Sequence, residues 1–224
     1  MSLRYDLIVF DFDGTLADSL PWFRTALADV LDFHGLPPVC EDKAESLRGL
    51  SPKAIMDELK IPAWKIPFIA NDVRKRAAQN IDQIPLFDGI NEMLDALVKA
   101  DIKIAMVSSN GEAAVRDVLG PDNAALVSHF ACGAALFGKA QIFRKVMKQA
   151  KALPARTLCV GDEVRDIDAA READCACAAV TWGFATREIL EASAPDYIFD
   201  AISEITECAR TKASQSVSSE NANA

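Results

Sequence analysis

Two aspartates stand at the end of an apolar stretch near the N-terminus. The stretch Leu7–Phe10 runs directly into Asp11 and Asp13, with Phe12 between them, and Gly14 follows. Two carboxylates at this spacing repel each other, and each raises the pKa of the other. A buried strand that ends in such a pair needs a compensating positive charge at its tip.

Three further groups of reactive residues appear later in the sequence. They are Ser108, Ser109 and Asn110 after an apolar run, Lys139 after Gly138, and Asp162 with Asp166 in "GDEVRD". Each group alone is weak evidence, because Ser and Asn commonly cap helices and a single lysine is usually solvated. Their order and spacing in one chain make them significant together.

Together, these residue types suit phosphoryl transfer. The carboxylates of Asp11, Asp13 and Asp162 need a cation, and Mg²⁺ accepts an all-oxygen site while keeping positions for water and a substrate phosphate. One carboxylate can attack phosphorus and form an aspartyl-phosphate. Its neighbour can protonate the leaving alcohol and then activate water. Ser108 and Lys139 would hold the phosphoryl oxygens in place.

The elements that must position these residues alternate between strands and helices. The apolar runs predict strands at Leu7–Phe10, Ile102–Val107, Leu126–Ala131, Thr157–Val160, Cys177–Thr181 and Tyr197–Phe199. Helical patterns of about 10–15 residues between strands predict an α/β fold with a Rossmann-like parallel sheet and helices on both faces. Ligands of such sheets bind outside the carboxyl ends of the strands, where the reactive groups are expected.

The helix after the second strand bears on the phosphate site. The sequence "SSNGEAAVRDVLG" predicts a helix that starts at its Ser and Asn residues and stops at Gly120-Pro121. Its first residues would then offer hydroxyls and free backbone N–H groups, which favour a phosphate.

No convincing strand appears between Leu16 and Ile84. Helical patterns there begin at Ser19 and recur around Glu41–Leu47, Pro52–Leu59 and Pro67–Gln79. A structureless loop of this length would be unusual, so residues 16–83 are expected to form a small all-helical cap inserted after the first strand. Residues 1–15 and 84–209 would form the α/β core, and residues 210–224 a disordered or loosely packed tail.

Composition excludes several classes of protein. The net charge of −9 argues against a nonspecific binder of nucleic acid or of an anionic membrane surface. No apolar stretch approaches the length of a membrane span, and no signal peptide is visible. None of the six cysteines forms a C-x-x-C pair, which favours buried, reduced thiols and a cytoplasmic protein. No pattern indicates an oligomeric state.

The motifs resemble those of the haloacid dehalogenase (HAD) superfamily, and more narrowly its phosphoglycolate-phosphatase-like members with a helical cap. The resemblance extends from about Tyr5 to Ala209. "DFDGTLADS" resembles the first motif, "IAMVSSN" the second, "GKA" the third and "GDEVRDIDAAREAD" the fourth, and "VTWGF" resembles a common late stretch. The third motif departs from the family pattern, because Ala140 stands where proline usually follows the lysine.

The resemblance implies catalytic and metal-binding roles. Asp11 would be the nucleophile and Asp13 the acid/base. Asp11 and Asp162 would bind Mg²⁺ through their carboxylates, and Asp13 through its backbone oxygen. Asp166 would bind the Mg²⁺ ion through a water molecule, or would hold the direct ligands in place without binding the ion.

The resemblance also implies substrate contacts. Ser108 and Lys139 would bind the phosphate, assisted by the N–H groups of Ser109 and Asn110. "LRGLSPKAI" resembles the cap loop that reaches into the active site, so Arg48 and Gly49 are candidate substrate contacts.

The leading hypothesis is a Mg²⁺-dependent phosphatase acting on a small phosphorylated metabolite such as phosphoglycolate. One alternative is a β-phosphoglucomutase-like phosphotransferase, which would carry a cap histidine where Phe23 stands here. Another is a HAD-fold protein that binds a ligand or partner without turnover. Such proteins tend to lose a catalytic carboxylate or the lysine, and this chain retains them.

Overall fold

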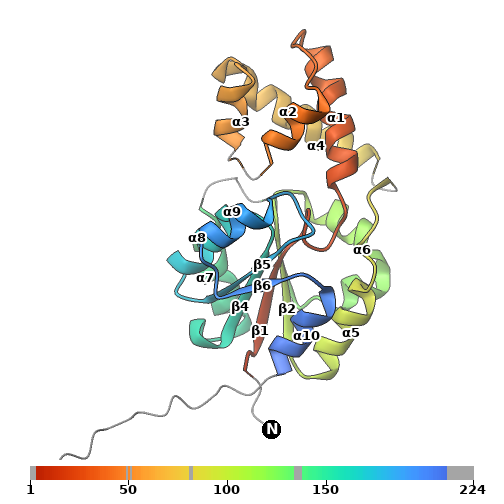
Figure 1. Ribbon diagram of the computed structural model, residues 1–224. Coiled ribbons are helices and arrows are strands. Elements are labelled where there is room, and N and C mark those ends of the chain that lie inside the picture. The colour runs from red at the N-terminus through yellow and green to blue at the C-terminus, as the bar shows by residue number, and fades with distance from the viewer. Residues whose placement is uncertain (1–3, 49, 51, 81–82, 134–137, 211–224) are drawn as a thin grey trace, which may run out of the picture.

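Parallel β-strands form the centre of the molecule (Figure 1). The computed structural model describes residues 4–48, 50, 52–80, 83–133 and 138–210. Six strands in these ranges are β1 (Leu7–Asp11), β2 (Lys103–Ser108), β3 (His129–Cys132), β4 (Thr157–Gly161), β5 (Ala176–Val180) and β6 (Tyr197–Phe199). They form one sheet in the order β3-β2-β1-β4-β5-β6, and every neighbouring pair is parallel. The expected α/β fold with a parallel sheet is confirmed.

The described helices fall into two groups. Those around the sheet are α5 (Ile90–Lys99), α6 (Glu112–Leu126), α7 (Lys139–Ala150), α8 (Val164–Glu172), α9 (Arg187–Ala192) and α10 (Ile202–Arg210), with a short 3₁₀ helix η3 (Pro154–Arg156). Those between β1 and α5 are α1 (Leu20–Phe33), α2 (Glu41–Ser46), α3 (Pro52–Glu58) and α4 (Ile66–Gln79), with the 3₁₀ helix η1 (Ala63–Lys65). The predicted helices of this insert agree with these bounds to within about one residue at most ends.

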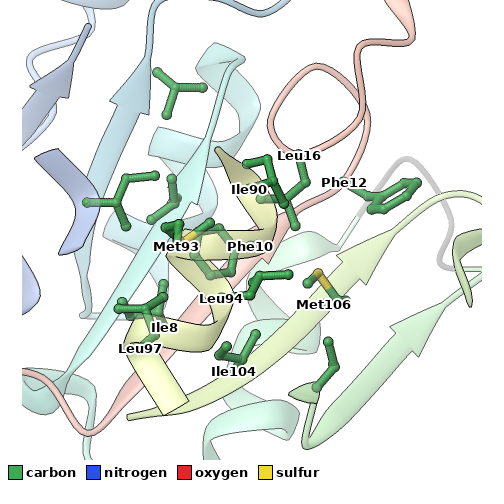
Figure 2. Packing of buried hydrophobic residues seen from close by; sticks show 14 of the residues in the cluster. Ile8, Phe10, Phe12, Leu16, Ile90, Met93, Leu94, Leu97, Ile104 and Met106 are labelled. Atoms are coloured by element: carbon green, nitrogen blue, oxygen red, sulfur yellow. The ribbon is translucent and has the colours of Figure 1, made fainter. Parts of the chain in front are cut away.

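The central strand is buried on both faces, because successive side chains of a strand point to opposite sides. Ile8 and Phe10 pack with α5, α6 and α10 in one cluster of buried hydrophobic residues. Leu7 and Val9 pack with α7, α8 and α9 in a second cluster. Figure 2 shows part of the first cluster, to which Phe10 of β1 and Leu94 of α5 both belong. This two-sided packing fixes the strand whose tip carries the aspartates.

The helices α1–α4 lie above the carboxyl edge of the sheet and have a hydrophobic cluster of their own (Figure 1). Val30 and Leu31 of α1 pack there with Ile69 of α4 and with Ile61. A helical insert after the first strand agrees with the sequence expectation. Its independence as a cap domain with the boundaries 16–83 stays a prediction.

Two predictions for the segment between β2 and β3 need correction: the start of the third strand and the end of the helix before it. The strand expected at Leu126–Ala131 is wrong at its start, because α6 extends to Leu126 and β3 begins at His129. Gly120 does break the helix, with φ 72° and ψ 165°, but Pro121 starts a second helical segment. Proline suits that position because a first helical turn needs no N–H from it.

Residues 211–224 of the expected tail lie outside the described residues.

All six cysteines are free, and Cys159, Cys175 and Cys177 are buried as expected, whereas Cys40 is exposed. Within the described ranges, no helix has both the length and the apolar character that a membrane span requires.

Candidate active site

The side chains of the sequence motifs meet at the carboxyl edge of the sheet. Asp11 ends β1, Ser108 ends β2, Asp162 follows β4 directly, and Lys139 begins α7. Asp11 is 5% exposed, Ser108 2% and Asp162 0%. Parallel strands bring their carboxyl ends to the same edge, so residues far apart in sequence converge here.

The turn after the aspartate pair requires glycine for two reasons. Gly14 has a φ of +73°, in the left-handed region that favours glycine. A Cβ atom at this position would also lie 2.3 Å from Oδ2 of Asp162 and 2.5 Å from the ring of Phe184. The chain can therefore leave β1 beside Asp162 only through a residue without a side chain.

Three buried carboxylates form a possible cation site. Asp11, Asp162 and Asp166 each offer one oxygen, and these atoms lie within 4.8 Å of one another among the described residues. Burial raises the pKa of Asp162 well above its usual value, and the charges of Glu163 and Asp11 add to this. A bound cation would offset that cost directly.

The charge balance of the surroundings also fits a divalent cation. Asp13 and Glu163 add two carboxyl groups to the three of the cluster. Among the described side chains that act on these carboxyls, Lys139 and Arg165 supply the positive charge. Five acidic groups thus face two cations, and the available donors are oxygens, the ligands that Mg²⁺ prefers.

Lys139 connects two of the carboxylates. Its Nζ donates to Oδ1 of Asp11 at 2.7 Å and to Oδ1 of Asp166. Burial by itself lowers the pKa of Lys139, but the carboxylates of Asp11 and Asp166 outweigh it, and the pKa lies above its usual value. The lysine is therefore charged at neutral pH and fixes one oxygen of Asp11.

Asp13 has different partners from Asp11. Its Oδ2 accepts a hydrogen bond from Nδ2 of Asn110 at 2.8 Å. Burial and the charge of Asp11 raise the pKa of Asp13 to about 6. Burial also raises the pKa of Asp11, although Lys139 opposes this. A carboxyl group with a pKa close to neutrality can both donate and accept a proton, as an acid/base residue must.

Asp162 is held at both oxygens. The hydroxyl of Thr15 donates to Oδ1 at 2.8 Å, and the backbone N–H of Phe184 donates to Oδ2 at 2.7 Å. Gly183 packs against the same carboxylate, since a Cβ there would lie 2.4 Å from Oδ2 of Asp162. These supports were not predicted, although Thr15 lies in the stretch "DFDGT" and Gly183 and Phe184 lie in "VTWGF", both of which resemble family motifs.

Asp166 belongs to the first turn of α8 and faces the site. Its Oδ2 accepts the backbone N–H of Glu163 at 3.0 Å, and its other oxygen pairs with Lys139. The Glu163 side chain in turn accepts an N–H of the helix and forms an ion pair with Arg165. The Glu163–Arg165 pair was not predicted, because "GDEVRD" alone does not show that both side chains turn inward.

Of the residues expected to bind phosphate, Ser108 ends β2, Ser109 and Asn110 follow it, and Asn110 contacts Asp13. The backbone N–H of Asn110 donates to the hydroxyl of Ser108 at 3.0 Å, and half-buried Ser109 lies between them. The helix itself begins only at Glu112, with Gly111 as its cap, so Ser108 ends a strand rather than starting a helix. Phosphate binding by these residues stays a prediction.

Arg48, the expected substrate contact, follows α2 and reaches across to the core. Its Nε donates to the carbonyl of Phe184 at 3.0 Å, and its Nη2 donates to the carbonyl of Gly183 at 2.9 Å. Gly49, the other expected contact, lies outside the described residues.

The chain is similar to known proteins over most of its length. Residues 8–180 match the family model described as haloacid dehalogenase-like hydrolase. The chain belongs to this family. Among curated proteins, it is 30% identical to a phosphoglycolate phosphatase of Synechococcus elongatus, over 88% of this chain and 94% of that one. The expectation that the protein is an enzyme of this family, a phosphatase, is confirmed.

Solved structures agree in fold. The crystal structure of a putative phosphoglycolate phosphatase from Lactobacillus plantarum has a TM-score of 0.80 at 21% identity, covering 92% of this chain and 99% of that one. A predicted phosphoglycolate phosphatase from Haemophilus somnus has a TM-score of 0.75 at 24% identity, covering 91% and 97%. These HAD-like structures confirm the fold of the chain.

Proposed function

We propose that this HAD-like phosphatase hydrolyses a small, phosphoglycolate-like phosphate monoester, depends on Mg²⁺, and forms an aspartyl-phosphate on Asp11. The observation that carries the proposal is the unequal environment of the two β1 aspartates. Asp11 is paired with Lys139, whereas Asp13 is bonded to Asn110 and has a pKa of about 6. Two neighbouring carboxyls with different partners suit two different roles.

In the first step, an oxygen of Asp11 attacks the phosphorus of the substrate. The new bond joins that oxygen to phosphorus, and the ester P–O bond to the alcohol breaks. Asp13, in its protonated form, gives its proton to the departing alcohol oxygen. Lys139 holds the other oxygen of Asp11 and offers positive charge beside the transferring group.

In the second step, Asp13 accepts a proton from water as the water oxygen attacks phosphorus. The bond between phosphorus and Asp11 then breaks, which releases inorganic phosphate and restores the carboxylate. Ser108 and the N–H group of Ser109 orient the phosphoryl oxygens in both steps, and the N–H of Asn110 joins them once it leaves the Ser108 hydroxyl.

The carboxylates of Asp11 and Asp162 and the backbone oxygen of Asp13 would hold the Mg²⁺ ion, with Asp166 beside them. When bound, Mg²⁺ neutralises charge on the phosphoryl oxygens and positions the substrate. The fit rests on the oxygen-only donors and on the excess of buried acidic groups over cations.

The substrate proposal rests on the relatives. Phosphoglycolate phosphatases cover nearly the whole chain. The helices α1–α4 lie above the edge of the sheet that carries the site (Figure 1), where they would contact the leaving group. The cytoplasm stays the location that the sequence predicts.

Hydrolysis of p-nitrophenyl phosphate tests the chemistry. The wild type should be active with MgCl₂ and inactive with EDTA, and Asp11→Asn should lose activity by about 10³-fold or more, because an amide is a poor nucleophile. Asp6→Asn is the matched control, since Asp6 precedes the opposite end of β1 and pairs with Arg156. Activity that persists in Asp11→Asn or in EDTA contradicts the proposal.

A panel of phosphorylated metabolites tests the substrate. Phosphoglycolate should rank high in kcat/KM. Transfer of phosphate between hexose phosphate positions, rather than to water, would favour the mutase alternative. No turnover of any compound, with ligand binding intact, would favour a non-catalytic protein.

A further inference from the structure

One peptide group joins the helical insert to the candidate cation site. The carbonyl of Gly183 and the N–H of Phe184 belong to the same planar peptide unit. Arg48 donates from Nη2 to that carbonyl at 2.9 Å, and the N–H donates to Oδ2 of Asp162 at 2.7 Å. The guanidinium and the carboxylate therefore bind opposite ends of one peptide dipole.

Hydrogen bonds in such a chain polarise one another, and those with charged partners are the strongest. The cation on the carbonyl makes the N–H a better donor to Asp162. The second bond of Arg48, from Nε to the carbonyl of Phe184 at 3.0 Å, holds the next peptide unit of the chain, so that the guanidinium grips two successive carbonyls of the loop.

Other contacts hold the same loop in place. The ring of Phe23 in α1 makes an edge contact with Phe184, at 5.6 Å between centroids. From the core side, Nε1 of Trp182 donates to the carbonyl of Thr15 at 3.1 Å, and the Thr15 hydroxyl bonds to Asp162. Both carboxylate oxygens of Asp162 thus accept hydrogen bonds that involve the loop 182–184: one from Phe184 in the loop, and one from Thr15, which is bonded to the loop.

We propose that Arg48 is a positioning residue, which orients the Gly183–Phe184 peptide and through it the carboxylate of Asp162. A change in the position of the helices α1–α4 relative to the core then also changes the geometry of the cation site. The expected effect of Arg48 on activity rests on the proposed Mg²⁺-dependent reaction. The effect of Arg48 on the Gly183–Phe184 peptide does not.

This role differs from direct recognition of a substrate carboxylate. The Nη1 atom of Arg48 donates to Glu45 at 2.8 Å, so Nε, Nη1 and Nη2 all have protein partners, and the side chain is only 23% exposed. Turning the guanidinium toward a substrate would break its bonds to the loop. The two roles therefore predict different kinetics.

The kinetic test compares two substrates that differ in a carboxylate. In Arg48→Ala, kcat should fall and the Mg²⁺ concentration for half-activation should rise by about ten-fold or more, as loss of a charge-assisted hydrogen bond implies. Both effects should be equal for phosphoglycolate and p-nitrophenyl phosphate. A selective rise in KM for phosphoglycolate, with unchanged Mg²⁺ dependence, overturns the proposal.

A second readout needs no activity. Hydrogen exchange of the Phe184 amide, measured with and without Mg²⁺, should be about ten-fold faster in Arg48→Ala than in the wild type. Unchanged exchange overturns the proposal even if the enzyme is active. If no phosphatase activity exists, the proposed function fails, but this measurement still decides the coupling.

Two variants serve as controls. Lys43→Ala removes another cation of the insert, which pairs with Glu58, and should exchange like the wild type. Arg48→Lys keeps the charge but cannot reach both carbonyls with one planar group. It should give intermediate exchange and an intermediate Mg²⁺ dependence, so the proposal can be tested even if Arg48→Ala folds poorly.

Discussion

At the scale of single residues, Asp11 and Asp13 are the same chemical group in two environments. Lys139 fixes one oxygen of Asp11, while Asn110 donates to Asp13 and leaves it with a pKa of about 6. The cost of crowding like charges at the tip of β1 is offset by Lys139, which the sequence motifs singled out, although only the fold shows that it bonds to Asp11 rather than to solvent. Asp162 depends in the same way on the close approach of Gly14 and Gly183.

Gly183→Ala should impair the site without removing any functional group. The added Cβ would lie 2.3 Å from Cβ of Asp162 and 2.5 Å from the carbonyl oxygen of Gly14, so the loop must move. Overpacking of this kind destabilises by about 1–3 kcal/mol. Activity and Mg²⁺ affinity, measured by titration of the hydrolysis rate, should both fall.

Gly111→Ala is the matched control, because a Cβ there meets nothing within 4 Å. It should keep the wild-type Mg²⁺ dependence. A Gly183→Ala variant that titrates like the wild type would show that the loop does not constrain Asp162.

At the scale of elements, the sequence was most informative where periodicity decides structure. The strands around the site and the four insert helices could be predicted to within a few residues, because apolar runs and helical spacing record which faces are buried. The start of β3 could not be predicted in this way. The second segment of α6, which begins at Pro121, ends in apolar residues whose pattern resembles that of a strand. The supports of Asp162 from Thr15 and Phe184 are long-range contacts, which periodicity does not encode.

The helices α1–α4 should behave as a separate unit of stability. Ile69 is buried in the hydrophobic cluster of this insert, so Ile69→Ala should destabilise it by about 2–5 kcal/mol. Hydrogen exchange should accelerate in α1 and α4 while protection in β1 and β4 persists. Leu94→Ala, in the core cluster of Figure 2, should instead accelerate exchange in the strands. Equal acceleration of insert and strands by Ile69→Ala contradicts the proposed cap boundaries.

At the scale of the whole molecule, acidic residues outnumber basic ones, and several of them gather at one place. The chain carries a net charge of −9, and five acidic groups gather at one edge of the sheet. A cation that binds only the folded protein stabilises it by mass action. Folding stability should therefore depend on divalent ions.

Mg²⁺ should raise the melting temperature by several degrees. At a concentration 100-fold above its dissociation constant, the gain is about 2.7 kcal/mol, and each kcal/mol shifts the midpoint by about 2–4 °C for a protein of this size. NaCl at matched ionic strength controls for screening of the net charge. Asp162→Asn should lose most of the shift. An equal shift in NaCl, or in Asp162→Asn, would argue against a specific site.

If the proposed mechanism holds, Asp11 becomes phosphorylated during turnover. The direct measurement is acid quenching of a reaction at saturating substrate and Mg²⁺, followed by peptide mass spectrometry. One phosphoryl group, labile to hydroxylamine, is expected on the peptide that contains Asp11, and none in Asp11→Asn. A phosphoryl group on another residue, or full turnover by Asp11→Asn with no trapped intermediate, would contradict it.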